Sequence, residues 1–427
     1  MEWLVPIIII TLALAGLPLF VVIVSLAMWG FFLAEIDLFV IAIEIYRLTD
    51  IPILSALPLF TFAGYLLSES NTSERLVAIS KALLGWLPAG LAIVTLLVSA
   101  IFTAFTGATG ATIVALGALL YPAMVSEGYR ENFSLGLVTT SGSLGLLIPP
   151  ALPLILYGVI AQQLDLDMQF TLQDLLIAGL IPALLMVTLL SFWAMLQSRS
   201  MPVQRVAFSW QRLVDAVKLG AWELPLAPLV LVGVYSGLFT LSEIAVISCL
   251  YLIIVEVFIY REIPFKKLSE VAAKAMIMSG GIMIVLAVSL ALANWMIDQS
   301  LPQQLFSWTQ QYVDNKVTFL ILLNIILLIL GAVLDIFSAL VIMVPLLLPV
   351  ASSYGIHPIH LGIIFLANMQ IGYLTPPIGM NLFIASYRFG KPINELFRSV
   401  LPFIALLLIA LMMITYIPQL SLMFVKQ

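Results

Sequence analysis

Long apolar runs, separated by short clusters of charged residues, restrict what this chain can fold into more than any other feature. Hydrophobic residues make up 63% of its 427 residues and charged residues only 9%, whereas a soluble domain is about half apolar and about a quarter charged. Such runs need lipid as their solvent, and one helical crossing takes ~20 residues. The sequence therefore predicts an all-α polytopic membrane protein, with room for roughly ten to fourteen crossings.

The distribution of basic residues predicts which loops face the cytoplasm. Two loops, 197–218 and 261–274, hold eight of the 17 basic residues. The segment 219–260 between them is long enough for two spans with a turn near Gly237, so both loops lie on one side of the membrane. The positive-inside rule places that side in the cytoplasm. A third basic group predicts a further cytoplasmic loop: Arg388, Lys391 and Arg398.

A Pro-Pro pair occurs twice in the chain, at Pro149-Pro150 and 227 residues later at Pro376-Pro377. Proline lacks an N–H donor and pushes the preceding residue out of helical geometry, so each pair interrupts a helix rather than bending it. Interrupted backbone at membrane depth is tolerated only where protein or a water-filled cavity covers it. Matched breaks in two halves point to a transporter's substrate site. Three more pairs share the same offset: Pro122 with Pro349, Gly128 with Gly355, and Gly145 with Gly372.

A second weak point precedes each Pro-Pro pair. Residues 103–110 are rich in threonine and glycine, which predicts a helix break or hairpin tip, while Thr112 could simply face a neighbouring helix. Residues 331–338 are the counterpart in the second half and contain Asp335. We therefore expect a single transporter unit over 1–427, with a first hairpin and repeat core at 84–165, an inter-repeat region at 198–274, and a second core at 318–390.

The backbone and side-chain groups at such breaks favour the binding of ions. Unwound carbonyl groups together with threonine or serine hydroxyls can replace the hydration shell of a small hard cation, and the N-termini of half-helices attract anions. This combination predicts coupling of Na⁺ to an anionic solute. Proton coupling is less favoured because titratable groups are scarce in the spans. Asp335 is a candidate for the pathway and for the cap of the half-helix that begins near Ile336, and the two roles are compatible. Asn368 and Gln370 are pathway candidates, and Asn324 is expected to form an interhelical hydrogen bond.

Other classes of function have little support in the sequence. His357 and His360 are the two histidines and Cys249 the single cysteine, and no His/Cys/carboxylate grouping has metal-site spacing. Both histidines fall near a predicted loop and are interpreted as surface residues. The chain has no phosphate-binding Gly-x-x-x-x-Gly-Lys-Ser/Thr run, no nucleophile–base pair for a membrane-embedded enzyme, and no nucleic-acid-binding signature.

Five short runs carry a resemblance to a known family. The chain resembles the large membrane subunit of tripartite ATP-independent periplasmic (TRAP) transporters, the DctM-like family, over nearly its whole length. The matching runs are residues 57–66 (LPLFTFAGYL), 87–92 (LPAGLA), 118–124 (ALLYPAM), 148–153 (IPPALP) and 375–382 (TPPIGMNL).

The resemblance implies a fold, a location and partners. It implies an inverted-repeat, elevator-type transporter with two re-entrant helical hairpins in the bacterial inner membrane. Its partners would be a small four-helix membrane subunit, here expected as a separate chain, and a periplasmic substrate-binding protein. Uptake would be driven by a Na⁺ gradient, with organic acids as substrates: C4-dicarboxylates, sialic acids, other sugar acids, oxo acids or sulfonates.

Three alternatives to a TRAP transporter subunit remain. They are a stand-alone Na⁺/dicarboxylate symporter that needs no binding protein, a membrane-embedded enzyme, and a purely structural subunit, which would have little reason to keep two matched helix breaks.

The resemblance also implies two Na⁺ sites made of backbone carbonyls and hydroxyls. Carried over by position, the first site comprises Thr103, Thr106, Gly145, Ile148 and Pro150, and the second comprises Gly331, Gly372, Thr375 and Ile378.

Overall fold

The computed structural model describes residues 4–14, 16–164, 170–203, 207–236, 238–313 and 315–425, and in these ranges the regular structure is helical throughout. Eight helical segments are long and apolar enough to cross a membrane. The prediction of an all-α polytopic membrane protein is confirmed. Two positions used above, Arg205 in the first basic loop and Gly237 in the expected turn, lie outside the described residues.

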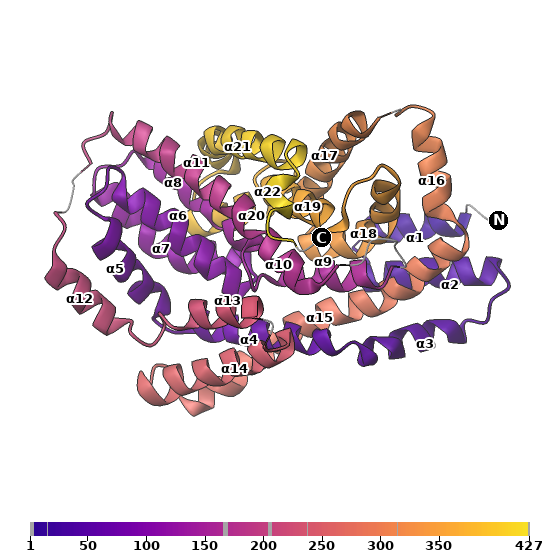
Figure 1. The fold of residues 1–427 in the computed structure, drawn as a ribbon, viewed down its shortest axis with the longest axis horizontal. Helices are drawn as coiled ribbons and strands as arrows, with labels where there is room; N and C mark the ends of the chain where they lie inside the picture. Colours follow the sequence, from indigo (N-terminus) through magenta and orange to yellow (C-terminus); the bar gives the residue numbers. More distant parts are fainter. Residues whose placement is uncertain are drawn as a thin grey trace.

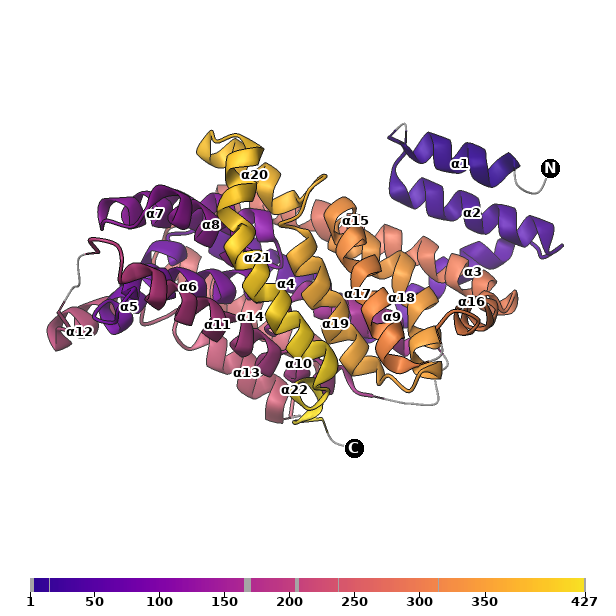
Figure 2. The same ribbon diagram turned by 90° about the horizontal axis from the view of Figure 1, so that it is seen from above.

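The helices form two groups joined by three connecting helices (Figures 1 and 2). The outer group consists of α1 (Leu4–Leu14), α2 (Leu19–Leu33), α3 (Phe39–Arg47), α4 (Ala56–Glu69), α13 (Leu226–Ser236), α14 (Leu241–Ile253, extended by a π-helix over Ile254–Ile259) and α15 (Phe265–Asp298). The inner group consists of α6 (Gly90–Thr106), α7 (Thr109–Ser126), α8 (Glu131–Ser141), α9 (Leu152–Gln162), α10 (Leu172–Ala178), α11 (Leu180–Ser198), α17 (Lys316–Val333), α18 (Ile336–Ser353), α19 (Pro358–Gly372), α20 (Met380–Phe389), α21 (Ile393–Tyr416) and α22 (Gln419–Leu422). The connecting helices are α5 (Thr72–Leu84), α12 (Trp210–Leu219) and α16 (Leu301–Gln310).

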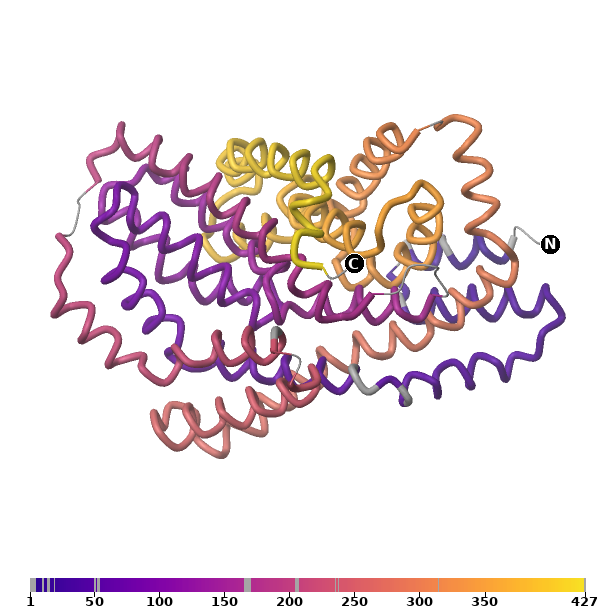
Figure 3. Tube along the Cα trace, viewed as in Figure 1, coloured from indigo at the N-terminus to yellow at the C-terminus, as the bar shows by residue number. Residues whose placement is uncertain are grey.

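The inner group contains the same element order twice, which Figure 3 lets the reader follow along the chain. A hairpin of two helices, α6–α7 or α17–α18, is followed by an interrupted helix, α8–α9 or α19–α20. Helix α7 and helix α18 begin and end at positions that differ by the 227-residue offset of the Pro-Pro pairs. The repeat in the sequence therefore encodes a repeated piece of structure.

The first hairpin opens at the end of the inner group where α21 begins. At the base of this hairpin, Lys81 at the end of α5 forms an ion pair with Glu127, which follows α7. Helix α8 starts at the same end, because the Glu131 carboxylate lies 2.6 Å from the amine of Lys391, just before α21. These contacts place both the open end of the hairpin and the start of α8 beside the start of α21.

The second hairpin opens at the opposite end. At its base, the Lys316 amine donates a hydrogen bond to the Gly355 carbonyl at 2.8 Å. The following helix α19 starts where α21 finishes, since the His360 ring contacts the Thr415 carbonyl at 3.2 Å. The two re-entrant hairpins thus enter from opposite ends, which is the geometry of an inverted repeat.

The burial of His360 corrects one sequence interpretation. Its side chain is 1% exposed and lies between Thr415 and the Ser421 hydroxyl, 3.2 Å from each. The ring belongs to the first turn of α19, which packs beneath α21 and α22, so nearness to a predicted loop did not place it on the surface. His357 is half-buried and accepts a hydrogen bond from the Ile359 N–H, which caps α19.

A buried charge cluster joins the connecting helix α5 to the outer group. Arg75 on α5 pairs with Glu223, Glu256 and Glu262, and its guanidinium lies 4.0 Å from the ring centre of Tyr260. The Glu256 side chain is fully buried on the π-helix that extends α14. One arginine thus pairs with three carboxylates, from the turn before α13, the π-helix and the loop before α15.

The two basic loops give a testable orientation. In a Cys249→Ala background, we expect Gln211→Cys on α12 to stay unlabelled in intact spheroplasts treated with a membrane-impermeant maleimide, and to label after permeabilisation. Leu238→Cys, 79% exposed at the turn between α13 and α14, is the matched control and should label from outside. Labelling of Gln211→Cys but not of Leu238→Cys from outside would place the basic loops in the periplasm instead.

Candidate ion and solute site

The tip of the first hairpin is formed by a glycine in left-handed geometry. Helix α6 ends at Thr106, and Gly107 has a φ of 63°, a region that glycine enters without steric penalty. Its N–H donates to the Thr103 carbonyl at 2.8 Å. Helix α7 begins at Thr109 after the extended residue Ala108. The chain therefore reverses within residues 103–110, where the sequence predicts a break.

The first interrupted helix passes directly behind this tip. Helix α8 ends at Ser141, a single 3₁₀ turn covers Leu144–Leu147, and α9 begins at Leu152 after the Pro-Pro pair. Gly145 in the 3₁₀ turn lies against the backbone of α6, where an added Cβ would overlap the Ala100 carbonyl oxygen and the Ala104 nitrogen. Only a residue without a Cβ allows this approach of two backbones.

A threonine hydroxyl ties the hairpin tip to the break. The Thr103 Oγ1 lies 2.7 Å from the Thr112 Oγ1 and donates to the Gly142 carbonyl at 2.9 Å. Thr112 thus faces a neighbouring helix, as its alternative interpretation proposed. The Thr106 side chain is buried at the tip, and its Oγ1 lies 3.5 Å from the Ala108 nitrogen. Hydroxyl and carbonyl oxygens from two elements converge here.

The second hairpin tip is capped by Asp335. Its carboxylate accepts hydrogen bonds from the N–H groups of Phe337 and Ser338, both at 3.0 Å. The Tyr373 hydroxyl, from just beyond α19, accepts a hydrogen bond from the Ile336 N–H at 2.6 Å. Asp335 therefore performs the capping role considered for it, while a role in the pathway stays a prediction.

The second interrupted helix meets the second hairpin through glycine, as the first does. A Cβ on Gly372 would lie 2.5 Å from the Gly331 backbone. The Ala332 carbonyl on the hairpin accepts hydrogen bonds from the N–H groups of Ile378 and Gly379, at 3.1 and 3.2 Å. Hairpin and interrupted helix are therefore joined by backbone contacts, and a side chain between them would separate the two.

Thr375 lies within the second break, and its hydroxyl is directed at the preceding helical turn. Its Oγ1 donates to the carbonyl oxygens of Ile371 and Gly372, both 3.0 Å away. The structure thus places each predicted set of ion-site residues at one hairpin and the break beside it.

The two breaks differ in exposure. Pro149 and Pro150 are buried, whereas Pro376, Pro377 and Ile378 are exposed. Among the remaining predicted residues, Thr103, Thr106, Gly145, Gly331 and Gly372 are buried, and Ile148 and Thr375 are half-buried. The break in the first half is therefore buried, whereas the break in the second half is exposed.

Asn368 and Gln370 lie on α19 just before the second break, as the sequence places them. The Asn368 amide donates to the Asn324 Oδ1 at 2.7 Å, which confirms the interhelical hydrogen bond predicted for Asn324. Gln370 accepts, on its main-chain carbonyl, a 3.5 Å hydrogen bond from the Ser143 hydroxyl. Ser143 and Gln370 are separated by the repeat offset, so they are equivalent positions that meet where the two halves touch.

Several buried oxygens around this contact have no hydrogen-bond partner among the described residues. Two lie on α19, the side-chain carbonyls of Asn368 and Gln370. Three others were missed by the sequence reasoning: the Thr139 and Thr140 hydroxyls and the Asn381 Oδ1. Asn381 follows the second break and donates to the Thr139 carbonyl at 3.5 Å. Their position in the sequence could have identified the two threonines. Thr139 and Thr140 precede the first Pro-Pro pair, just as Asn368 and Gln370 precede the second.

The side chains at these breaks are unsuited to transition metals. No group of three or more His, Cys, Asp or Glu side chains within the described ranges could hold a metal ion. The oxygens present are carbonyls, hydroxyls and amides, which suit a hard cation with weak individual ligands.

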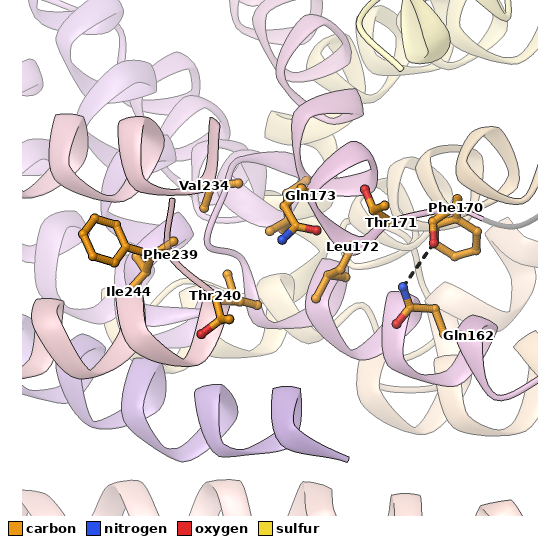
Figure 4. A pocket seen from close by; sticks show the side chains of 11 residues that line it. Gln162, Phe170, Thr171, Leu172, Gln173, Val234, Phe239, Thr240 and Ile244 are labelled. Carbon is orange, nitrogen blue, oxygen red and sulfur yellow. Dashed lines mark hydrogen bonds between the residues drawn. The ribbon is translucent and has the colours of Figure 1, made fainter. Parts of the chain in front are cut away.

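A separate hollow of about 320 Å³ lies between the inner and outer groups (Figure 4). It is mostly apolar and is lined by the end of α9, the start of α10 and the α13–α14 turn, including Gln162, Thr171, Val234 and Thr240. Gln162 donates to the Phe170 carbonyl at 3.2 Å within it. None of the predicted site residues lines this hollow.

Comparison with known proteins finds a family whose sequence model matches this chain. Residues 6–420 match the sequence model described as the tripartite ATP-independent periplasmic transporter, DctM component. The chain is 32% identical over 384 residues to the C4-dicarboxylate TRAP transporter large permease protein DctM of Pseudomonas aeruginosa, covering 90% of this chain and 88% of that one. It is 32% identical over 389 residues to the isethionate TRAP transporter permease protein DctMQ of Oleidesulfovibrio alaskensis, covering 90% of this chain and 60% of that one. It is 29% identical over 374 residues to the sialic acid TRAP transporter large permease protein SiaM of Vibrio cholerae, covering 87% and 85%.

The fold also resembles a solved structure. The crystal structure of the Alcanivorax borkumensis YdaH transporter superposes with a TM-score of 0.61 at 15% identity, covering 88% of this chain and 86% of that chain. At this identity the likeness concerns the fold alone.

Proposed function

Because the chain belongs to the DctM component family of tripartite ATP-independent periplasmic transporters, we propose that it couples a Na⁺ gradient to the uptake of a small organic anion. It is a multi-pass large permease of the bacterial inner membrane. Relatives are named for dicarboxylates, isethionate and sialic acid, which share a carboxylate or sulfonate group. The observation that carries the proposal is the pair of matched hairpin–break contacts.

Na⁺ would bind at these two contacts. In the first half it would take oxygens from Thr103, Thr106, Gly145, Ile148 and Pro150. In the second half it would take them from Gly331, Gly372, Thr375 and Ile378. At the first contact, hydroxyl and carbonyl oxygens come from the hairpin and the break. At the second, the Thr375 hydroxyl and the carbonyls of Ile371 and Gly372 belong to the interrupted helix, and the hairpin adds the Ala332 carbonyl beside them. Carbonyl and hydroxyl oxygens are the donors that a small hard cation requires.

The organic anion would bind between the two interrupted helices. Helices α9 and α20, which start at the breaks, have no side-chain N-cap, in contrast to α18 with Asp335. A helix start without a side-chain acceptor suits an anion. The Thr139 and Thr140 hydroxyls, for which the described part of the chain supplies no partner, can donate to a carboxylate or sulfonate. Asn368, Gln370 and Asp335 remain candidates for the same pathway.

Transport would proceed by an elevator movement of the inner group against the outer group. Three connecting helices, α5, α12 and α16, join the groups, and both hairpins with their breaks belong to the inner group. Such an arrangement lets the ion and solute sites move as one body.

The chain would work with a small four-helix membrane subunit and a periplasmic substrate-binding protein. One relative has the name DctMQ, and this chain spans 60% of its length. The remaining length of that relative leaves room for a second membrane component.

Reconstitution into proteoliposomes tests this function. We expect uptake of a labelled organic acid that needs an inward Na⁺ gradient, the small subunit and the cognate binding protein. Uptake without a binding protein would favour the stand-alone Na⁺/dicarboxylate symporter, and no uptake under any gradient would reject both.

Thr375→Val tests the second ion site. The substitution removes the hydroxyl and keeps the shape, so we expect the Na⁺ concentration for half-maximal uptake to rise about tenfold or more, since a hydrogen bond or ligand to a charged group contributes ~1.5–3 kcal/mol. Thr375→Ser should retain most Na⁺ affinity. Thr188→Val is the matched control, because the Thr188 hydroxyl is exposed on α11 and bonds only the Leu184 carbonyl. Unchanged Na⁺ dependence in Thr375→Val would remove this side chain from the site.

A further inference from the structure

A hollow of about 270 Å³ opens at the end of the inner group where α8 and α21 begin and α11 ends. It lies away from both breaks and contains none of the predicted ion or solute residues. Its lining combines two arginines with polar and aromatic side chains, among them Arg130, Asn132, Trp193, Gln197, Arg398 and Pro402. The loop that follows α11 belongs to the basic segment predicted to be cytoplasmic.

The two arginines have no carboxylate partner among the described residues. The nearest acids in the sequence, Glu131 and Glu395, are both engaged by Lys391, at 2.6 and 3.5 Å. Glu131 also accepts a hydrogen bond from the Tyr121 hydroxyl at 2.9 Å. Arg130 makes one long contact, 3.5 Å from its Nη2 to the Ser200 carbonyl. Two guanidinium groups therefore present uncompensated positive charge to one hollow.

Exposed apolar side chains neighbour the lining residues along α11 and α21. Phe192 on α11 is 58% exposed and Leu401 on α21 is 44% exposed. They adjoin the lining residues Trp193 and Pro402 along their helices. Tryptophan is enriched where a membrane meets water, with its ring at the level of the headgroups. On both helices, an exposed apolar residue thus lies further from the charged end of the hollow than the arginines do.

We propose that this hollow binds an anionic phospholipid of the cytoplasmic leaflet, with its phosphodiester headgroup on Arg130 and Arg398 and an acyl chain along Phe192 and Leu401. Guanidinium groups bind phosphate oxygens through paired N–H donors. Basic pockets between membrane helices on the cytoplasmic side suit such headgroups. A soluble anion would use the two arginines but would gain nothing from the apolar surface beside them.

The experiment is native mass spectrometry of the full chain in detergent, titrated with phosphatidylglycerol or with phosphatidylcholine of the same acyl chains. We expect wild type to bind phosphatidylglycerol more tightly than phosphatidylcholine. Arg130→Gln/Arg398→Gln should weaken phosphatidylglycerol binding about ten- to thirtyfold, because each basic group near an anionic headgroup contributes ~1 kcal/mol. Arg130→Lys/Arg398→Lys should keep most of the binding.

The matched control is Arg212→Gln/Lys218→Gln on α12, which removes the same charge from the same predicted side. Its phosphatidylglycerol binding should equal that of wild type. Equal binding of the two lipids by wild type, equal loss in the control, or no loss in the Arg130/Arg398 variant would overturn the proposal. Displacement of the lipid by inorganic phosphate at ordinary buffer concentrations would assign the hollow to a soluble anion instead.

Discussion

Gly372→Ala is expected to slow Na⁺-driven uptake strongly. The new methyl group would lie 2.5 Å from the Gly331 backbone on the second hairpin. Backbone cannot rotate away as a side chain can, so the hairpin and the interrupted helix must separate. Overpacking of this kind costs about 1–3 kcal/mol in a well-packed interior. Here the same displacement moves the carbonyl oxygens proposed to bind Na⁺, so we expect uptake to fall by about tenfold to a hundredfold.

The measurement is the initial rate of uptake in proteoliposomes at saturating Na⁺, together with the thermal unfolding of the purified chain. Gly280→Ala is the matched control, because Gly280 is exposed within α15 and a Cβ there meets nothing within 4 Å. It should transport at the wild-type rate. Normal uptake by Gly372→Ala would show that the close approach of Gly331 and Gly372 is dispensable.

Arg75→Gln is expected to cause the largest loss of stability. Arg75 is the only cation that the described residues bring to Glu223, Glu256 and Glu262, and Glu256 is fully buried. Removing one partner of a buried pair leaves uncompensated charge and costs about 3–5 kcal/mol. Because the cluster fastens the connecting helix α5 to the outer group, we expect the purified chain to unfold at a clearly lower temperature.

A double substitution separates the loss of charge balance from the loss of packing. Arg75→Gln/Glu256→Gln removes one of the stranded carboxylates, so it should be more stable than Arg75→Gln alone. Lys274→Gln is the control, since its pairs with Glu69 and Glu270 are exposed and such pairs contribute about 0–1 kcal/mol. If Arg75→Gln unfolds at the wild-type temperature, the cluster does not hold α5.

The sequence predicted the repeated part of the fold because proline and glycine act locally. Pro149-Pro150 and Pro376-Pro377 break their helices wherever they stand, and the 227-residue offset linked the two halves. The tip near Gly107 followed from local composition for the same reason. These predictions needed no knowledge of which helices are neighbours.

Features that depend on distant contacts were not predictable in this way. The burial of His360 is set by α21 and α22, more than fifty residues further along the chain. Arg75 meets its three carboxylates across similarly long separations, and nothing in the loop composition pairs them. Thr139 and Asn381 become candidates only when the two halves are seen in contact. The capping role of Asp335 also required the structure, because it depends on the positions of the Phe337 and Ser338 N–H groups.

The different exposure of the two breaks bears on the movement proposed for transport. Both halves have the same internal architecture, yet one break is enclosed and the other open. The imbalance therefore belongs to the surroundings of each half and not to its internal construction. If each half took the surroundings of the other, the first break would become exposed and the second buried. Every helix and every backbone contact within the halves would stay the same. Under the proposed movement, the chain would then have two end states of similar free energy, so a modest ion or solute binding energy would be enough to choose between them.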